Sequence, residues 1–397
     1  MMANVNFKQK RPVAGAALRL SAIILVASLA GCSMFSGVGS TVGGWFGSKK
    51  PEPKELGPNV AVIGVRQAWT TKVGAVGFPL VADVHGSTVT LASSDGNVVA
   101  LDARTGAELW RASAGAPLSA GVGSDGTLAA VVSTGNEIVA FAGGKPLWRS
   151  KLAAESFTPP LVAGGRVFVL AADRSVSAYD GKTGRRLWNQ PRPGEPLVLR
   201  QAGVLVAAGD TLVVGLSGRL SGLNPDNGSL RWEAPIAASR GTNDVERLVD
   251  LVGHVNQQDG VLCARAFQSA VGCVDATRGQ LLWSKPASGY NGVDGDEQNI
   301  YGTESNGFVN AWRRADGERA WSIDRLQYRQ LTAPLVLGRS VVFGDSTGLV
   351  HFLSRDAGAP LNRLTTDGSG IAAMPVQAEG TLVVVTKSGG VFGFVPE

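Results

Sequence analysis

The sequence is poor in charged residues, histidine and cysteine, and each scarcity narrows the classes of protein to which it can belong. Charged residues make up 17% of the 397 positions, against about 25% in typical soluble domains, which excludes a coiled coil and an acidic disordered chain. The three histidines, His85, His254 and His351, lie far apart and no cysteine cluster accompanies them, so we predict no metal site and no bound cofactor. Glycine, in contrast, is abundant with 53 residues and favours many tight turns between apolar strands.

Basic charge is concentrated at the start of the chain. The net charge is +5, but residues 1–31 hold Lys8, Lys10, Arg11 and Arg19 and no acid, which leaves only +1 for the remainder. A nucleic-acid partner usually requires a basic patch on the folded domain. We therefore predict no nucleic-acid partner.

Long hydrophobic runs are also missing. The longest early run, 20–30, has eleven residues, too few to span a bilayer as a helix, and with the basic residues before it predicts an export signal over residues 1–31. Leu29-Ala30-Gly31-Cys32 resembles the lipobox of bacterial lipoproteins, whose cysteine takes up diacylglycerol and becomes the new N-terminus. The resemblance implies lipidation at Cys32, and Ser33 after it implies release to the outer membrane.

Residues 32–60 carry no helical or strand periodicity. They are rich in glycine, serine, lysine and proline, a composition typical of flexible linkers. At about 5–6 Å times the square root of the residue number, such a tether would hold a domain about 30 Å from the membrane.

From residue 61 onward the sequence repeats. Similar segments, each with a turn, an alternating strand, a second turn and a tryptophan, end at Trp110, Trp148, Trp188, Trp232, Trp283 and Trp321. A further copy has Asn362 in the tryptophan position, and the last copy ends before that position is reached. A strand led by Trp69 with nothing before it supplies the missing piece, which gives eight units.

Each unit of about 42 residues holds four short strands, which is the size of a propeller blade. We predict an all-β fold over residues 61–397, an eight-bladed β-propeller with four antiparallel strands per blade. The N-terminal strand at Trp69 would close the last blade as its outer strand. The tryptophans would pack between blades.

Two glycine motifs resemble catalytic or nucleotide-binding sequences. Residues 121–126 fit G-x-G-x-x-G and residues 344–348 fit G-x-S-x-G, but both motifs act at a strand-to-helix junction. Here they fall within strand-turn-strand repeats. Neither therefore predicts a site.

Cys263 and Cys273 flank a turn near Gln268 in one blade. Residues equidistant from the turn of an antiparallel hairpin face each other, with Cβ atoms about 4.5–5.5 Å apart. Exported proteins keep disulfides, so the spacing predicts a cross-strand disulfide. Two buried free thiols are the alternative, because a register shift of one residue would point the thiols to opposite faces.

The two longest intervals between tryptophans are adjacent and add length to residues 189–200 and 237–251. In a four-stranded blade these linkers leave on the same face of the ring. Both mix apolar side chains with arginine and aspartate, a composition that favours a docking surface over a catalytic cleft. The alternative is that both are loop insertions without function.

The lipobox, tether and eight tryptophan-marked repeats together resemble the BamB family, the lipoprotein subunits of the β-barrel assembly machinery of Gram-negative outer membranes. The resemblance is most specific at residues 331–351, with Leu-Thr-Ala-Pro, then Gly-Asp-Ser-Thr-Gly, then His. It implies a lipid-anchored scaffold without enzymatic activity that faces the periplasm from the outer membrane. Such a scaffold docks on the POTRA domains of BamA within the Bam complex and promotes insertion of β-barrel proteins.

The family's partner contacts lie in a Leu-x-Leu-Arg stretch, matched by Leu197, Leu199 and Arg200, and in an acidic loop one blade later. Asp250 matches the first aspartate of that loop, whereas Val252 occupies the position of the second. Exposed blade edges could also hold nascent barrel strands by β-augmentation.

Periplasmic quinoprotein dehydrogenases are the alternative from another functional class. They too are eight-bladed and tryptophan-marked, and hold pyrroloquinoline quinone and calcium in the central channel. That reading implies a much longer chain and a pair of adjacent cysteines, and this sequence has no adjacent cysteines.

Overall fold

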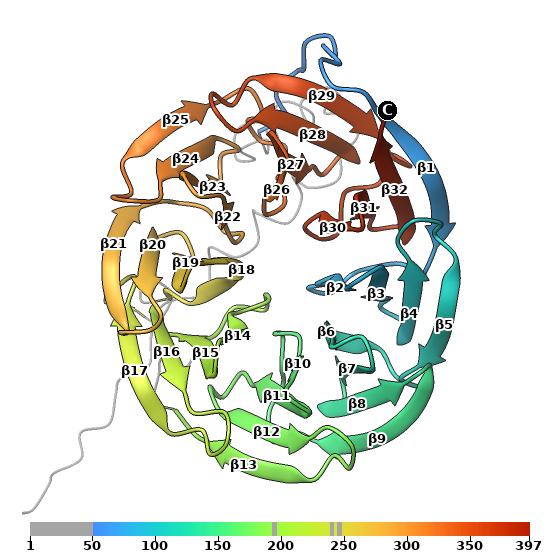
Figure 1. The fold of residues 1–397 in the computed structure, drawn as a ribbon, viewed down its shortest axis with the longest axis vertical. Helices are drawn as coiled ribbons and strands as arrows, with labels where there is room; N and C mark the ends of the chain where they lie inside the picture. Colours follow the sequence, from blue (N-terminus) through green and yellow to red (C-terminus); the bar gives the residue numbers. More distant parts are fainter. Residues whose placement is uncertain (1–50, 193–196, 239–241, 244–247) are drawn as a thin grey trace, which may run out of the picture. The chain divides into compact units, whose positions relative to one another are not determined.

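A ring of eight four-stranded antiparallel sheets forms the folded part of the chain (Figure 1). The computed structural model describes residues 51–192, 197–238, 242–243 and 248–397, and the ring lies in one compact unit, Glu52–Glu397. Every regular element in these ranges is a strand, and no helix among them is long and apolar enough to cross a membrane. The predicted fold class is confirmed.

The blades follow the chain in order, and each runs from the channel to the rim. Blades 1 to 4 comprise β2 (Asp83–His85), β3 (Thr88–Ala92), β4 (Asn97–Asp102) and β5 (Glu108–Ser113); β6 (Leu118–Ser124), β7 (Leu128–Ser133), β8 (Glu137–Ala142) and β9 (Lys145–Lys151); β10 (Leu161–Ala163), β11 (Arg166–Leu170), β12 (Val176–Asp180) and β13 (Arg186–Gln190); and β14 (Leu205–Ala208), β15 (Thr211–Leu216), β16 (Arg219–Leu223) and β17 (Leu230–Pro235). Blades 5 to 8 comprise β18 (Leu251–Gln258), β19 (Val261–Ala266), β20 (Ala270–Asp275) and β21 (Gln280–Pro286); β22 (Asp294–Gly295), β23 (Asn299–Thr303), β24 (Val309–Arg313) and β25 (Arg319–Ile323); β26 (Leu335–Leu337), β27 (Ser340–Gly344), β28 (Leu349–Ser354) and β29 (Pro360–Thr365); and β30 (Val376–Ala378), β31 (Thr381–Val385), β32 (Gly390–Pro396) and β1 (Val65–Lys72).

The core lies between the blades. The second and third strands of each blade are covered on both faces, so β7 is buried at all six positions, and such strands read as nearly continuous apolar runs. The outer strands alternate instead, as the exposure pattern of β1 shows, because only their inner face meets a neighbouring blade.

The N-terminal strand closes the ring, as predicted. β1 pairs with β32 in antiparallel register from Val65 opposite Pro396 to Lys72 opposite Gly390. The last blade thus contains three C-terminal strands and one N-terminal strand.

Each tryptophan of the repeat joins its own blade to the next one. Trp148 lies opposite Ala140, a small residue on the third strand of its blade. Its indole N–H donates to the carbonyl of Gly181 in blade 3 at 2.8 Å. Its ring packs on Gly184, where an added Cβ would lie 2.5 Å from the indole. The same contact with a glycine of the following blade recurs for Trp69, Trp110, Trp188, Trp232, Trp283 and Trp321.

Asn362 breaks the repeat for a topological reason. Blade 8 has no turn between its third and fourth strands, because these are β32 and β1, the last and first strands of the ring. Asn362 instead donates to the carbonyl of Ile63 at 2.8 Å. Asn362 lies opposite Phe352. In the other blades a tryptophan on the fourth strand lies opposite a small residue on the third, so in blade 7 the bulky side chain is on the third strand instead.

The folded unit begins earlier than the sequence predicted. Residues 52–60 were expected to belong to the flexible tether, but the N–H of Lys54 donates to the carbonyl of Gln327 at 3.0 Å. Leu56 packs against a buried cluster that includes Leu326 and Leu331. A composition typical of linkers therefore did not exclude specific packing on the ring. The predicted signal peptide and the first part of the tether, residues 1–50, lie outside the described residues.

Candidate docking surface

The linkers between blades leave the ring on the same face as the hairpins between the second and third strands, because successive strands alternate in direction. The linker from blade 3 to blade 4 therefore shares its face with the linker from blade 4 to blade 5. The hairpin at residues 171–175 of blade 3 lies on this face as well.

Asp250 connects these three segments through an ion pair with Arg174. Nη1 of Arg174 lies 2.9 Å from Oδ1 of Asp250, and the two side chains are only 6% and 14% exposed. Nη2 of Arg174 donates to the carbonyl of Leu197 at 2.9 Å. The N–H of Leu199 donates to Oδ2 of Asp250 at 3.2 Å. One charged pair thus holds the hairpin and both linkers together.

The leucine-arginine stretch is held at the surface by these contacts. Leu197 is 41% exposed and Arg200 is exposed as well. The guanidinium of Arg200 lies over the ring of buried Phe157, 5.1 Å from its centroid, and such a cation–π contact restrains the side chain. Leu199 is half-buried and, with Asp250, lines a cleft of about 50 Å³.

The predicted contact residues therefore fall into two groups. Leu197 and Arg200 face outward, whereas the carboxylate of Asp250 is directed into the protein. Val252, in the position of the family's second aspartate, is 1% exposed and pairs with a residue of β19. Residues 244–247 of the acidic loop and Cys32, the predicted lipidation site, lie outside the described residues.

Sequence reasoning missed Arg174 and Phe157. Arg174 occupies a turn position that is glycine in several other blades. Its φ of 63° lies in the left-handed region, where residues other than Gly and Asn are uncommon. An arginine at a position that favours glycine was the available signal. Nothing in the sequence marked Phe157 beyond its hydrophobicity.

Comparison with known proteins decides the family. The family model described as outer membrane protein assembly factor BamB matches residues 94–323, more than half of the chain. The protein of that name from Burkholderia pseudomallei is 41% identical over 84% of this chain and 89% of its own length. The one from Bordetella pertussis is 36% identical over 91% and 92%. This chain belongs to the BamB family.

Solved structures agree with the ring architecture. BamB from Moraxella catarrhalis superposes with a TM-score of 0.75 at 22% identity, over 83% of this chain and 99% of that structure. A quinohemoprotein alcohol dehydrogenase from Comamonas testosteroni reaches a TM-score of 0.67 at 15% identity, over 85% of this chain and 78% of that structure. At these identities both comparisons describe the fold alone.

Inner strands of the blades surround a central channel of about 940 Å³. Asp83 and Asp294, on the inner strands of blades 1 and 6, are among its lining residues. Asp83 accepts the N–H of Ser124 at 3.1 Å, and Asp294 accepts the N–H of Val336 at 2.8 Å. Burial raises the pKa of Asp83 to about 6, although the Ser124 N–H opposes the change. Both carboxylates thus link their blade to the next. Within the described ranges no group of three or more His, Cys, Asp or Glu residues could hold a metal ion.

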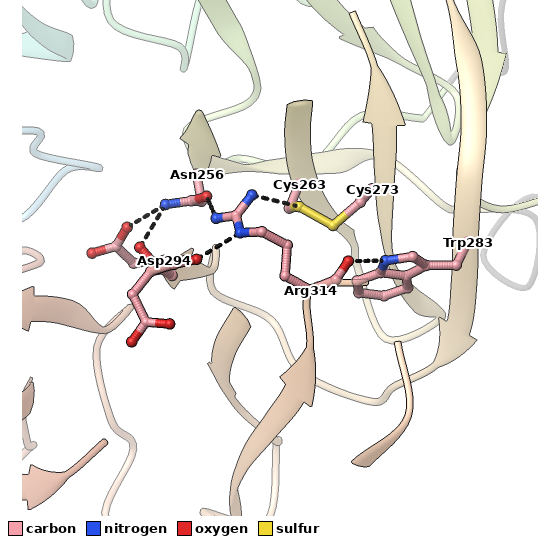
Figure 2. Close-up of a disulfide and its surroundings, with 8 residues drawn as sticks. Asn256, Cys263, Cys273, Trp283, Asp294 and Arg314 are labelled. Atoms are coloured by element: carbon pink, nitrogen blue, oxygen red, sulfur yellow. Dashed lines mark hydrogen bonds between the residues drawn. A yellow bond between two sulfur atoms is a disulfide. The ribbon is translucent and has the colours of Figure 1, made fainter. Parts of the chain in front are cut away.

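The structure contains the disulfide that the cysteine spacing predicted. Cys263 lies directly opposite Cys273 in the β19–β20 register, and their Cα atoms are 4.0 Å apart. Both residues are fully buried beside Trp283. Figure 2 shows the side chain of Arg314 next to this bond, with Nη1 3.8 Å from Sγ of Cys263, while its carbonyl accepts the indole N–H of Trp283 at 2.7 Å. The disulfide therefore stabilises the contact between blades 5 and 6 and does not line the channel.

Proposed function

We propose that this protein is a non-enzymatic, lipid-anchored scaffold of the outer-membrane β-barrel assembly machinery that binds POTRA domains of BamA. Membership of the BamB family supports the role in outer-membrane protein assembly. The geometry that supports the binding site is the outward-facing stretch of Leu197 and Arg200, held on the linker face by the buried Arg174–Asp250 pair.

The residues of this surface have different roles in the proposed binding. Leu197 supplies exposed apolar area, and Arg200 supplies a charge for an acidic partner residue, oriented by the ring of Phe157. A rigid, pre-positioned arginine loses less side-chain entropy on binding than a mobile one. Asp250 supports the surface from beneath by holding Arg174 and the N–H of Leu199.

The test is the affinity of the chain without residues 1–32 for purified POTRA domains. We expect Leu197→Ala/Arg200→Ala, which removes the two outward-facing side chains, to lower affinity strongly. Arg185→Ala serves as the matched control, since Arg185 is an exposed arginine in the turn between β12 and β13, on the opposite face of blade 3. Unchanged affinity in the double variant would move the site elsewhere. Absence of binding by the folded wild type would refute the proposal that BamA is the partner.

Lipid anchoring at Cys32 is the second part of the proposal and rests on the lipobox, Leu29-Ala30-Gly31-Cys32. We expect the wild type to fractionate with outer membranes and to carry acyl chains detectable by mass spectrometry of the N-terminal peptide. Cys32→Ala would abolish both. An unmodified Cys32 in membrane-bound protein would refute lipidation.

The enzymatic alternative predicts a quinone in the central channel. The protein's two other cysteines are neither adjacent nor in the channel, because they form the buried disulfide of blade 5. We expect purified protein to show no visible quinone absorption and no alcohol-dependent reduction of a dye after addition of quinone and calcium. Dye reduction would reopen the enzymatic reading.

Exposed leucines on the outer strands favour a further role in holding unfolded barrel strands. Leu109, Leu147 and Leu230 are 53%, 47% and 49% exposed, and each lies on the outermost strand of its blade. Edge strands offer unpaired backbone groups to an incoming strand. A photo-crosslinker at Leu147 should capture an unfolded barrel protein, and one in the turn at Lys182 should not.

A further inference from the structure

Blade 7 has two features that play no part in the proposed docking surface. Its tryptophan position holds Asn362, and the hairpin between its second and third strands begins with Asp345, which is completely buried. Asp345 belongs to the Gly-Asp-Ser-Thr-Gly motif within residues 331–351, where the resemblance to the BamB family is most specific. Asn362 contacts the segment Lys54–Ile63, which we name the strap. Asp345 is connected to the same segment through Arg329.

The first attachment of the strap is a buried charge network. Oδ2 of Asp345 lies 3.0 Å from Nη1 of Arg329 and 2.9 Å from Nε2 of His351. Arg329 in turn donates from Nη2 to the carbonyl of Lys54 at 2.9 Å, and from Nε at 3.2 Å. Burial opposes ionisation of Asp345, but the hydrogen bond and charge of His351 and the N–H of Leu349 hold its pKa well below the usual range. The ionised carboxylate thus orients an arginine whose other donors hold the strap backbone.

The second attachment is the outer edge of β29. The N–H of Val62 donates to the carbonyl of Leu361 at 2.6 Å, and Asn362 donates to the carbonyl of Ile63. The side-chain amide of Asn59 donates to Asn362 and to the carbonyl of Arg363, at 2.9 and 3.0 Å. The strap therefore follows an edge strand whose backbone groups would otherwise face solvent.

The strap is the segment through which the anchor reaches the ring. Figure 1 shows it beside β29, on the side of the ring opposite blade 3, where β10–β13 lie. We propose that blade 7 is the attachment site for the chain's own anchor segment, so that the lipid-anchored end leaves the rim at blade 7 and the blade 3 side of the ring points away from the membrane. This proposal rests on lipidation of Cys32, part of the proposed function. It predicts that blade 7 lies nearer the membrane than blade 3, because contacts with blade 7 hold the chain from Lys54 to Ile63.

The first experiment asks whether the strap stays docked in solution. Lys-C cuts after Lys54 only if the carbonyl held by Arg329 becomes free, and cleavage after Lys49 provides an internal reference. We expect severalfold slower cleavage after Lys54 than after Lys49 in the wild type, and loss of this protection in Arg329→Gln. Arg325→Gln, at an exposed arginine of the same linker, is the matched control. Equal cleavage at both lysines of the wild type would overturn docking.

The second experiment measures orientation on lipid vesicles. The mature lipidated protein is labelled with a donor dye at Asp356→Cys or Lys182→Cys, equivalent exposed turn positions of blades 7 and 3. The vesicles, of phosphatidylethanolamine and phosphatidylglycerol, carry an acceptor lipid. The native disulfide is buried and does not react with the dye. We expect severalfold more energy transfer from blade 7.

A strap variant separates release of the strap from damage to the ring. Replacing residues 54–60 with glycine and serine changes no ring residue and leaves the contacts of Val62 and Ile63 with blade 7. We therefore expect it to reduce the difference between the two label positions while the circular dichroism spectrum is unchanged. Equal transfer from both positions in the wild type would refute the orientation. Failure of the wild type to bind vesicles would refute lipidation instead, and the protease experiment would still report on docking.

Discussion

Replacing either member of the Arg174–Asp250 pair tests whether Asp250 acts on the partner directly or through the loop it holds. Removing one partner of a buried ion pair costs about 3–5 kcal/mol. The 14% exposure of Asp250 places this pair near the lower end, at about 3 kcal/mol. Because the linkers can open without unfolding the ring, we expect this loss in the local opening free energy of the loop.

The assay is hydrogen exchange at the N–H of Leu199, which donates to Asp250, together with affinity for POTRA domains. Since 1.4 kcal/mol corresponds to a factor of ten, Arg174→Ala and Asp250→Ala should each speed exchange about 100-fold and lower affinity. Arg174→Met/Asp250→Leu replaces the pair with apolar groups and should cost much less than the sum of the single changes. Arg186→Ala, an exposed arginine of blade 3, should change neither quantity.

Additive effects of the single changes on exchange would refute the coupling between Arg174 and Asp250. Loss of affinity in Asp250→Ala with no change in exchange at Leu199 would show that Asp250 contacts the partner itself. Either result would contradict the inward role of its carboxylate.

Three further perturbations test the packing, the disulfide and a channel carboxylate. Gly184→Ala should lower the urea midpoint of unfolding far more than Gly164→Ala. Both glycines have positive φ, at 70° and 57°, but only at Gly184 would the new Cβ meet a tryptophan, Trp148. Equal losses would show that the indole moves aside. Cys263→Ala/Cys273→Ala should cost about 2–3 kcal/mol of unfolding free energy, as expected for a short disulfide loop, and no loss relative to the wild type under oxidising conditions would show that the bond contributes nothing. Asp83 has a folded pKa of about 6, above its unfolded value, so its contribution to stability is present below about pH 4 and is lost as pH rises through 6. Asp83→Asn should therefore raise the free energy of unfolding at pH 8 by about 1–3 kcal/mol and leave it unchanged at pH 4. A variant less stable than the wild type at pH 8 would contradict this sign.

The architecture could be predicted from the sequence because the tryptophan repeat marks a contact that all but one of the blades make. Seven of the eight positions pack on a glycine of the next blade, and the spacing is therefore visible along the chain. The pairing of Cys263 with Cys273 followed from the same regularity, since the turn between them fixes the register.

The candidate surface could be located by sequence but not resolved into roles. The length of the linkers marked the segment 189–200, and the resemblance to the BamB family marked Leu197 and Arg200 within it. The direction of the Asp250 carboxylate, however, depends on Arg174, 76 positions earlier in another blade. The strap was missed for a related reason. Its backbone is held by side chains more than 270 positions away, and no local pattern of residues 52–63 records such contacts.

Pairing of β1 with β32 closes the ring and thereby imposes an order on the steps of folding. The two strands are more than 300 residues apart, and joining such distant segments in one step would cost about 5 kcal/mol of loop entropy. Blades that dock one after another reduce this cost, because each brings the ends closer together. The join itself still has to wait for β32, the last strand of the ring in the order of the sequence. Until then β1 and the apolar faces of the first and last blades lack their partners, and such unpaired edges and apolar surfaces are prone to aggregation and proteolysis.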